Sequence, residues 1–204
     1  MRAVLPGILA MAAIVVVSNI LVQFLLGDWL TWGALTYPFA FLVTDLMNRL
    51  HGPARARVVV FAGFVIGVIC SLIGTQIHGE FGPLVTLRIA IGSGVAFLVA
   101  QLLDVAIFDR LRTGAWWRAP LASTLVGSAL DTALFFTIAF SAALTAIEPA
   151  NDVAWANEIL PILDMGPAAP LWVSLAIADY GVKLAIALIA LIPFRMLVQR
   201  LRAA

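Results

Sequence analysis

The chain has 204 residues, of which 63% are hydrophobic and only 11% are charged, and its mean hydropathy is +1.08. Soluble domains carry roughly 25% charged residues, so this composition excludes an ordinary soluble domain and makes lipid the solvent for most of the surface. The net charge of +1 indicates neither an acidic nor a basic partner, and the single cysteine, Cys70, excludes an intrachain disulfide.

Apolar stretches of about 20 residues, which are long enough to cross a hydrocarbon core of about 30 Å, recur along the chain. They cover residues 6–26, 32–50, 58–77, 83–108, 120–146 and 171–194. The sequence therefore predicts an all-α, polytopic membrane protein with six transmembrane helices in one transmembrane domain, residues 1–204. The first stretch is longer than the apolar region of a signal peptide, about 7 to 15 residues, so we expect it to be a helix of the protein.

The connections between these spans separate the charged residues by sign. One side of a six-helix arrangement holds Arg2, Arg49, Arg55, Arg57, Arg110, Arg112, Arg118, Arg195, Arg200 and Arg202. The other side holds Asp28, Glu80, Glu148, Asp152, Glu158 and Asp164, with no lysine or arginine. Because cytoplasmic connections are rich in lysine and arginine, we expect a multi-pass protein of the bacterial inner membrane with both termini in the cytoplasm.

The segment 148–170 is the one long connection, and it is rich in Ala, Pro, Asn and Asp. A loop of this length without periodicity is either functional or mobile. Two interpretations therefore stay open, a flexible outer lid and a disordered surface loop.

A few ionisable residues lie inside the predicted spans. They are Asp45, Arg88, Asp104, Asp131, Asp179 and Lys183. Each such charge costs about 2.5 to 3.5 kcal/mol at the centre of a span, so these residues usually face the bundle interior and mark a substrate or ion path. At about 1.5 Å per residue, Asp131 lies ~16 Å into its span, and Asp179 and Lys183 are also near the midplane. Asp45 and Asp104 are nearer the cytoplasmic face, where we expect snorkelling or pairing with loop arginines.

Asp131 has no opposite charge within reach on its own helix, so its partner must lie on another helix, in water or in a ligand. It is the first candidate for a carboxylate that recognises a ligand. Asp179 and Lys183 are four residues apart, which allows either an ion pair that makes insertion tolerable or a direct role in binding substrate. Asn19 and Gln23 are one turn apart near the outer end, where they can bond to another helix or to a ligand.

Short motifs in a consistent order run through most of the chain. They are Ser18-Asn19 with Val22-Gln23, Thr31-Trp32-Gly33-Ala34, Tyr37-Pro38-Phe39, Thr44-Asp45-Leu46, Gln101-Leu102-Leu103-Asp104-Val105, Phe108-Asp109-Arg110-Leu111-Arg112, Trp116-Trp117 with Ala119-Pro120, Ala122-Ser123-Thr124, Asp131-Thr132 with Phe135-Phe136, and Asp179-Tyr180 with Lys183. This pattern closely resembles the bacterial queuosine precursor transporter family, one of the vitamin-uptake-like groups. The segment 148–170 does not match it.

The resemblance implies uptake of a 7-deazaguanine base, such as preQ0, preQ1 or queuine, for queuosine salvage. It also implies a six-helix fold similar to the substrate-binding subunits of energy-coupling-factor transporters. The residues are compatible with such a ligand, because a carboxylate can accept two hydrogen bonds from the adjacent N–H donors of a guanine-like edge. Amides can satisfy its carbonyl, and aromatic rings can stack on its plane.

These roles define a set of candidate substrate-binding residues. Asp131 and Asp179 fit the carboxylate role, and the amide role falls to Asn19, Gln23 or Gln101. Phe135, Tyr180 or Trp172 would stack on the base, and the intramembrane cations Lys183 and Arg88 complete the set. Interfacial anchoring is the alternative explanation for the tryptophan.

Other classes of protein have less support. An intramembrane aspartyl protease would need paired aspartate motifs that are absent, and the two histidines, His51 and His78, fall on opposite sides of the membrane, so we expect neither an enzyme nor a metal site or cofactor. No feature indicates binding to nucleic acid. A transporter for another purine-like or vitamin-like solute is the main alternative. Energy coupling stays open between a proton-linked carrier using Asp131 or Asp179, a facilitator and, less expected, a subunit with an ATPase partner.

Overall fold

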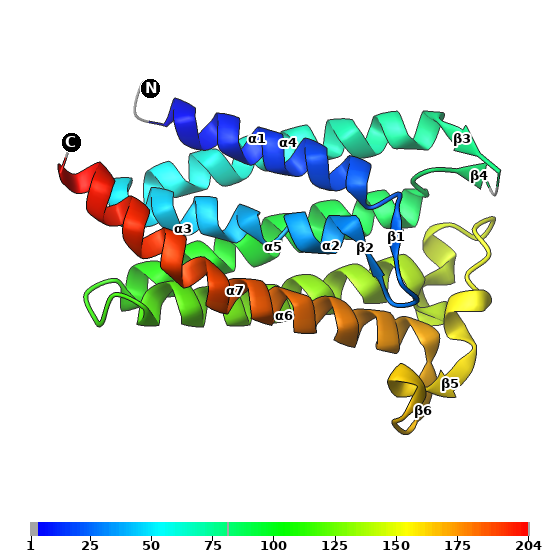
Figure 1. The fold of residues 1–204 in the computed structure, drawn as a ribbon. Coiled ribbons are helices and arrows are strands. Elements are labelled where there is room, and N and C mark those ends of the chain that lie inside the picture. Colours follow the sequence, from blue (N-terminus) through cyan, green and yellow to red (C-terminus); the bar gives the residue numbers. More distant parts are fainter. Residues whose placement is uncertain (1–3, 81, 204) are drawn as a thin grey trace.

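Helices lie roughly along one axis in the computed structural model, which describes residues 4–80 and 82–203 (Figure 1). They are α1 (Leu5–Leu21), α2 (Trp32–Thr36), α3 (Phe39–His51), α4 (Pro53–Gln76), α5 (Leu87–Leu111), α6 (Arg118–Phe140) and α7 (Leu171–Ala203). The two ends of the chain lie at the same end of this bundle, which we call the terminal end.

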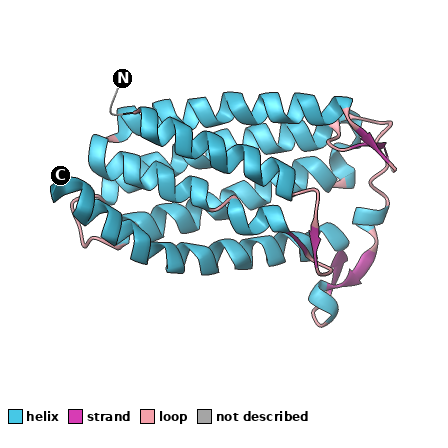
Figure 2. Cartoon of the chain, turned by 45° about the horizontal axis from the view of Figure 1, so that its top comes forward, coloured by secondary structure: helices cyan, strands magenta, loops and turns pink. Residues whose placement is uncertain are grey.

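The opposite end of the bundle carries three antiparallel hairpins (Figure 2). The hairpins pair β1 (Leu25–Leu26) with β2 (Leu30–Thr31), β3 (His78–Gly79) with β4 (Gly82–Pro83), and β5 (Ile159–Pro161) with β6 (Ala168–Pro170). Short 3-10 helices η1 (Ala142–Ile147), η2 (Trp155–Asn157) and η3 (Ile162–Asp164) complete this region. The segment 148–170, called the outer segment below, thus contains a hairpin and short helices rather than a structureless loop.

Within residues 4–80 and 82–203, four helices are long and apolar enough to cross a membrane, namely α4, α5, α6 and the part of α7 up to Leu201. Their large apolar side chains point outward: Leu72 on α4 and Ile189 on α7 are 59% and 65% exposed. Such exposure of large apolar groups is costly in water and favourable in lipid. The mostly helical fold therefore confirms the class of protein that the composition indicates, a multi-pass membrane protein.

The segment 32–50, predicted as one span, is broken into α2 and α3. Tyr37 and Pro38 lie between the two helices, and the break occurs here because proline has no N–H to donate and interrupts the helical ladder. The break places the Tyr37 side chain inside the bundle.

Other helix ends also differ from the limits set by hydropathy. The segment 6–26 is helical only to Leu21 and then turns at Gly27, whose φ of +66° suits a residue without a Cβ. Helix α5, expected to begin at residue 83, starts at Leu87, where the Thr86 hydroxyl caps it by accepting a hydrogen bond from the Ile89 N–H. Helix α6, expected to extend to residue 146, ends at Phe140, and α7, expected to end at residue 194, continues beyond it. Apolar composition predicts which segments of the chain lie in the lipid, whereas turns and capping residues determine where each helix ends.

The interior packs through small residues. On α5, a Cβ added to Gly92 would lie 3.3 Å from the backbone oxygen of Phe135 on α6. On α6, a Cβ at Gly127 would lie 2.9 Å from the Phe41 ring and 3.4 Å from the backbone oxygen of Ala100 on α5. This close approach of backbones is typical of helix packing in membranes, and it brings polar groups of α3, α5 and α6 together.

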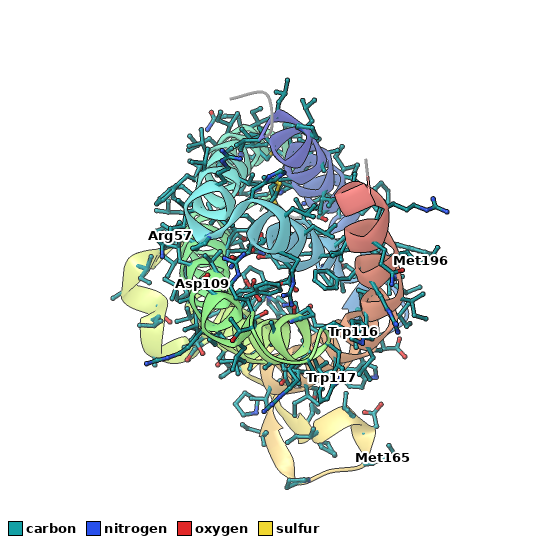
Figure 3. All side chains as sticks on the ribbon, turned by 90° about the vertical axis from the view of Figure 1, so that its left-hand side faces the viewer. Arg57, Asp109, Trp116, Trp117, Met165 and Met196 are labelled. Atoms are coloured by element: carbon teal, nitrogen blue, oxygen red, sulfur yellow. The ribbon has the colours of Figure 1, made fainter. Side chains whose placement is uncertain are left out.

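The charged connections lie at opposite ends of the bundle. The arginine-rich turns at residues 52 and 112–117 are at the terminal end, where Arg57, Asp109, Trp116 and Trp117 are labelled in Figure 3. The acidic connections form the three hairpins and the outer segment. Arg2 and the side chain of Arg202 lie outside the described residues. The alternation of charge expected from the sequence thus corresponds to the two ends of the molecule.

Candidate functional site

A buried cluster of charges joins α6 and α7 near the middle of the bundle. The Lys183 Nζ lies 2.7 Å from Asp131 Oδ2, forms a second ion pair with Asp179, and donates to the Thr132 hydroxyl at 2.9 Å. The Lys183 and Asp131 residues are each 3% exposed. The partner that Asp131 needs therefore lies on another helix, and the ion pair expected between Asp179 and Lys183 is present as well.

Tyr37, at the break between α2 and α3, extends this cluster. Its hydroxyl donates to Asp131 Oδ1 at 2.9 Å, and the Lys183 Nζ lies 5.4 Å from the centre of its ring. The Thr132 hydroxyl donates to Asp179 at 2.8 Å. Two carboxylates thus share one ammonium group and two hydroxyls, an arrangement in which every charge has a partner.

A cavity lies on the other side of the Tyr37 ring, between α1, α4, α5 and the helix break. The space that it leaves for the centres of water-sized molecules is about 40 Å³. Its wall includes the rings of Tyr37, Phe64 and Phe97, and its polar lining includes Asn19 and Ser71. The Tyr37 and Phe97 rings meet edge to face with their centres 6.2 Å apart. A planar ligand that stacks on aromatic rings suits such a wall.

Two of the three predicted amides do not line this cavity. Asn19 does: its Nδ2 donates to the Val15 carbonyl at 2.8 Å, which leaves its Oδ1 as an acceptor. Gln23 is exposed beyond the end of α1. Gln101 is fully buried elsewhere, where its Oε1 accepts from the Thr44 hydroxyl at 2.6 Å.

Arg88 is fully buried, but it is bound to backbone rather than to the charged cluster. Its Nε donates to the Ile138 carbonyl at 3.0 Å and its Nη2 to the Ser141 carbonyl at 2.6 Å, so it satisfies the last carbonyls of α6. Its own backbone N–H donates to Glu148. The structure therefore places Arg88 as an anchor between α5 and the start of the outer segment.

The three predicted stacking residues lie away from the cavity wall. Phe135 packs edge-on against Phe136, with ring centres 5.1 Å apart, and the Tyr180 hydroxyl contacts the Leu125 carbonyl at 3.4 Å. The Trp172 Nε1 is buried without a hydrogen bond to any residue described. The aromatic residues that line the cavity, Tyr37, Phe64 and Phe97, are not among the candidates from the sequence, although the break at Tyr37-Pro38 was a signal that could have located Tyr37.

A lipid-facing helical bundle with a compensated charge cluster and an aromatic cavity in its interior has the architecture of a membrane transport protein. Within the part of the chain that the structure describes, no three His, Cys, Asp or Glu side chains are grouped as metal ligands.

Comparisons with known proteins identify the particular family. Residues 31–198 match the family described as "Putative vitamin uptake transporter", and the chain belongs to this family of transporters. The chain is 36% identical over 203 residues to the "Queuosine precursor transporter" of Escherichia coli (strain K12), with 90% of this chain and 83% of the relative covered. None of the solved structures matches the chain.

Two further relatives carry the name "Probable queuosine precursor transporter". The protein of Haemophilus influenzae is 36% identical over 174 residues, which cover 80% of this chain and 66% of the relative. The protein of Bacillus subtilis (strain 168) is 29% identical over 187 residues, which cover 82% of this chain and 71% of the relative. The family confirms that this chain is a transporter rather than an enzyme, as the resemblance in the sequence indicates.

Proposed function

We propose that this protein imports queuosine precursors, 7-deazaguanine bases such as preQ0, preQ1 or queuine, across the bacterial inner membrane. The names of the relatives support this substrate class. The observation that carries the proposal is the cavity walled by Tyr37, Phe64 and Phe97, because three aromatic rings around a space suit a planar, apolar-faced base.

The proposed topology has six spans with both termini in the cytoplasm. Four spans are the long helices, α1 is a fifth with a length of about 25 Å at 1.5 Å per residue, and α2 with α3 forms a broken sixth. The arginine-rich turns at the terminal end support this orientation. The fold proposed from the resemblance is that of an energy-coupling-factor substrate-binding subunit, here working as a solitary carrier.

The substrate edge is recognised by Asn19 and Asp131 in this proposal. Asn19 lines the cavity, and its Oδ1 is the acceptor that it offers, because its Nδ2 donates to the Val15 carbonyl. Asp131 does not line the cavity, and its Oδ1 accepts from the hydroxyl of Tyr37, which does. The cavity holds on the order of a few water molecules as it stands. A bicyclic base therefore requires the rings to move apart, and movement of Tyr37 also exposes the carboxylate to the N–H donors of the base.

Lys183 and Asp179 support that carboxylate. The ion pair holds Asp131 in place, and the hydrogen bond from Thr132 holds Asp179. A guanine-like edge offers two adjacent donors to the exposed carboxylate, and charge-assisted hydrogen bonds of this kind are stronger than neutral ones. Adenine presents an acceptor in place of one of these donors, so the site should discriminate against it.

The test is a thermal-shift titration of the purified protein with preQ0, preQ1, queuine, guanine and adenine. We expect selective stabilisation by the deazaguanines. Asp131→Asn should weaken their binding about 10-fold to 150-fold, because a hydrogen bond to a charged group contributes about 1.5–3 kcal/mol. Asp28→Asn, an exposed acid in the first hairpin, is the matched control and should bind like the wild type.

Equal stabilisation by adenine would replace the proposed substrate class with a broader purine-like solute. Stabilisation by none of the five bases would refute the proposal and favour another vitamin-like solute. Unchanged binding in the Asp131→Asn variant would remove the carboxylate from the recognition site.

A further inference from the structure

A second buried polar cluster lies among α3, α5 and α6, and the proposed binding site does not use it. Its members are Thr44, Asp45, Asn48, Gln101, Asp104, Ser123 and Thr124, and each is at most 6% exposed. From the sequence we expected Asp45 and Asp104 to snorkel toward the membrane surface or to pair with loop arginines. The snorkelling is wrong, because these residues are 2% and 0% exposed.

The two carboxyl groups of this cluster face each other. The hydroxyls of Ser123 and Thr124 donate to the two Asp45 oxygens at 3.2 and 3.3 Å, and the Asp104 carboxyl lies next to them. Neither Asp104 oxygen has a well-formed hydrogen bond to any described residue, and the Gln101 Nε2 is also buried without one. Two adjacent carboxyls in a medium of low dielectric constant cannot both be ionised, so the arrangement is satisfied when one of them carries a proton.

The charge cluster at Asp131 differs in this respect. Asp131 and Asp179 both contact the Lys183 ammonium, so each of these carboxyl groups has a cation beside it. Both clusters nevertheless include residues of α6. Thr124 precedes Asp131 by seven residues on α6, about 10 Å along its axis, so the two clusters lie on one face two turns apart.

We propose that Asp45 and Asp104 form a proton-binding site that couples substrate import to the inward movement of a proton. The inference rests on the proposed function, because it supplies the energy coupling of that transport. In this proposal the Asp45–Asp104 site takes up a proton from the more acidic water outside the cell. The site releases the proton to the cytoplasm after the substrate has been released. The wall of a small cavity between α3, α6 and α7 includes Asp45 and Thr124, and it has room for on the order of one water molecule.

The surrounding ionisable groups define the setting of this site. On α3, Arg49 donates to the Arg112 carbonyl at 2.6 Å and lies 5.1 Å from the centre of the Phe108 ring. The α7 side of the small cavity consists of apolar residues, and Leu5–Leu21 of α1 contains no ionisable group. Arg88 on α5 is buried at the other end of that helix, and Asp131, Asp179 and Lys183 form the charge cluster described above. Further charged residues of the packed helices are exposed or, for Asp109 and Arg112, paired with each other: Arg55, Arg57, Asp109, Arg110, Arg112, Arg118, Arg195 and Arg200. His51, partly buried, ends α3.

The first experiment measures uptake of radiolabelled preQ0, a neutral base, into proteoliposomes with and without an acidic exterior. We expect the pH gradient to drive accumulation by the wild type. Asp104→Asn should lower this accumulation at least tenfold while preQ0 binding stays within threefold and exchange without a gradient continues. Asp109→Asn, on the same helix at the terminal end, is the matched control and should accumulate preQ0 normally.

A second measurement needs no substrate. The infrared spectrum of the lipid-embedded protein at neutral pH should contain a protonated-carboxyl band that is lost in the double variant Asp45→Asn with Asp104→Asn. A spectrum in which this band is absent from the wild type, or persists in the double variant, would overturn the proton-binding site whatever the substrate is. If preQ0 uptake does not depend on the pH gradient, the coupling is overturned but the proton-binding site is not. If the infrared band is present but preQ0 does not bind, the proposed substrate is rejected and the proton-binding site is not.

Discussion

Removal of the Lys183 ammonium should destabilise the protein far more than removal of either carboxylate charge beside it. Lys183 contacts Asp131 at 2.7 Å and also pairs with Asp179, and the three residues are largely buried. In Lys183→Met the side chain keeps a similar length, but two carboxylates are left without a cation. In Asp131→Asn one carboxylate and one ammonium are left, and Tyr37 retains an oxygen to which it can donate.

Breaking a buried ion pair from one side costs about 3–5 kcal/mol, because the remaining charge stays in a medium of low dielectric constant. In a domain of this size each kcal/mol lowers Tm by about 2–4 °C, so Lys183→Met should lower Tm by roughly 6–20 °C. Asp131→Asn should lower Tm by less than half as much. Thermal unfolding in detergent, followed by intrinsic fluorescence and circular dichroism, measures both.

The control for the lysine variant is Leu188→Met, on the same helix at a position that is 57% exposed to lipid. It should change Tm by no more than a few degrees, since it changes no charge and creates no buried cavity. Equal losses in Lys183→Met and Asp131→Asn would refute the reasoning, because they would show that net charge in the cluster does not determine its stability.

Two further predictions concern packing and the outer segment. Gly33→Ala would place a Cβ 2.9 Å from backbone atoms of Val22 and should lower the free energy of unfolding by about 1–3 kcal/mol. The control is Gly181→Ala, whose new Cβ meets nothing within 4 Å and should leave Tm unchanged or higher. Similar changes of Tm in both variants would contradict this reasoning. Asn157→Ala removes three side-chain hydrogen bonds, which join Asn157 to Phe140 at the end of α6, to Ala142 in η1 and to Val153 in the outer segment. Hydrogen exchange of the outer segment in nanodiscs should therefore become faster than in Asn151→Ala, which removes one hydrogen bond. Equal exchange in the two variants would show that these bonds do not hold the segment.

The sequence predicted the membrane class, the approximate positions of the helices and the two charged ends, because hydropathy and the distribution of arginine are properties of the chain itself. It also gave the ion pair between Asp179 and Lys183, which are four residues apart on one helix, as one of two interpretations, and this pair is present. It could not predict the break at Tyr37 or the cap at Thr86, since these depend on local backbone geometry within an otherwise apolar stretch.

Periodicity places a residue at a depth and on a face of its own helix, but it does not say which faces of different helices meet. The sequence by itself therefore determined that Asp131 needed a distant partner and that the family is one of transporters. The tertiary structure decided that Lys183 is this partner, that Tyr37 separates it from an aromatic cavity, and that Asp45 and Asp104 are buried against each other. The physical reason is that the close packing of α3, α5 and α6, which Gly92 on α5 and Gly127 on α6 permit, sets these distances.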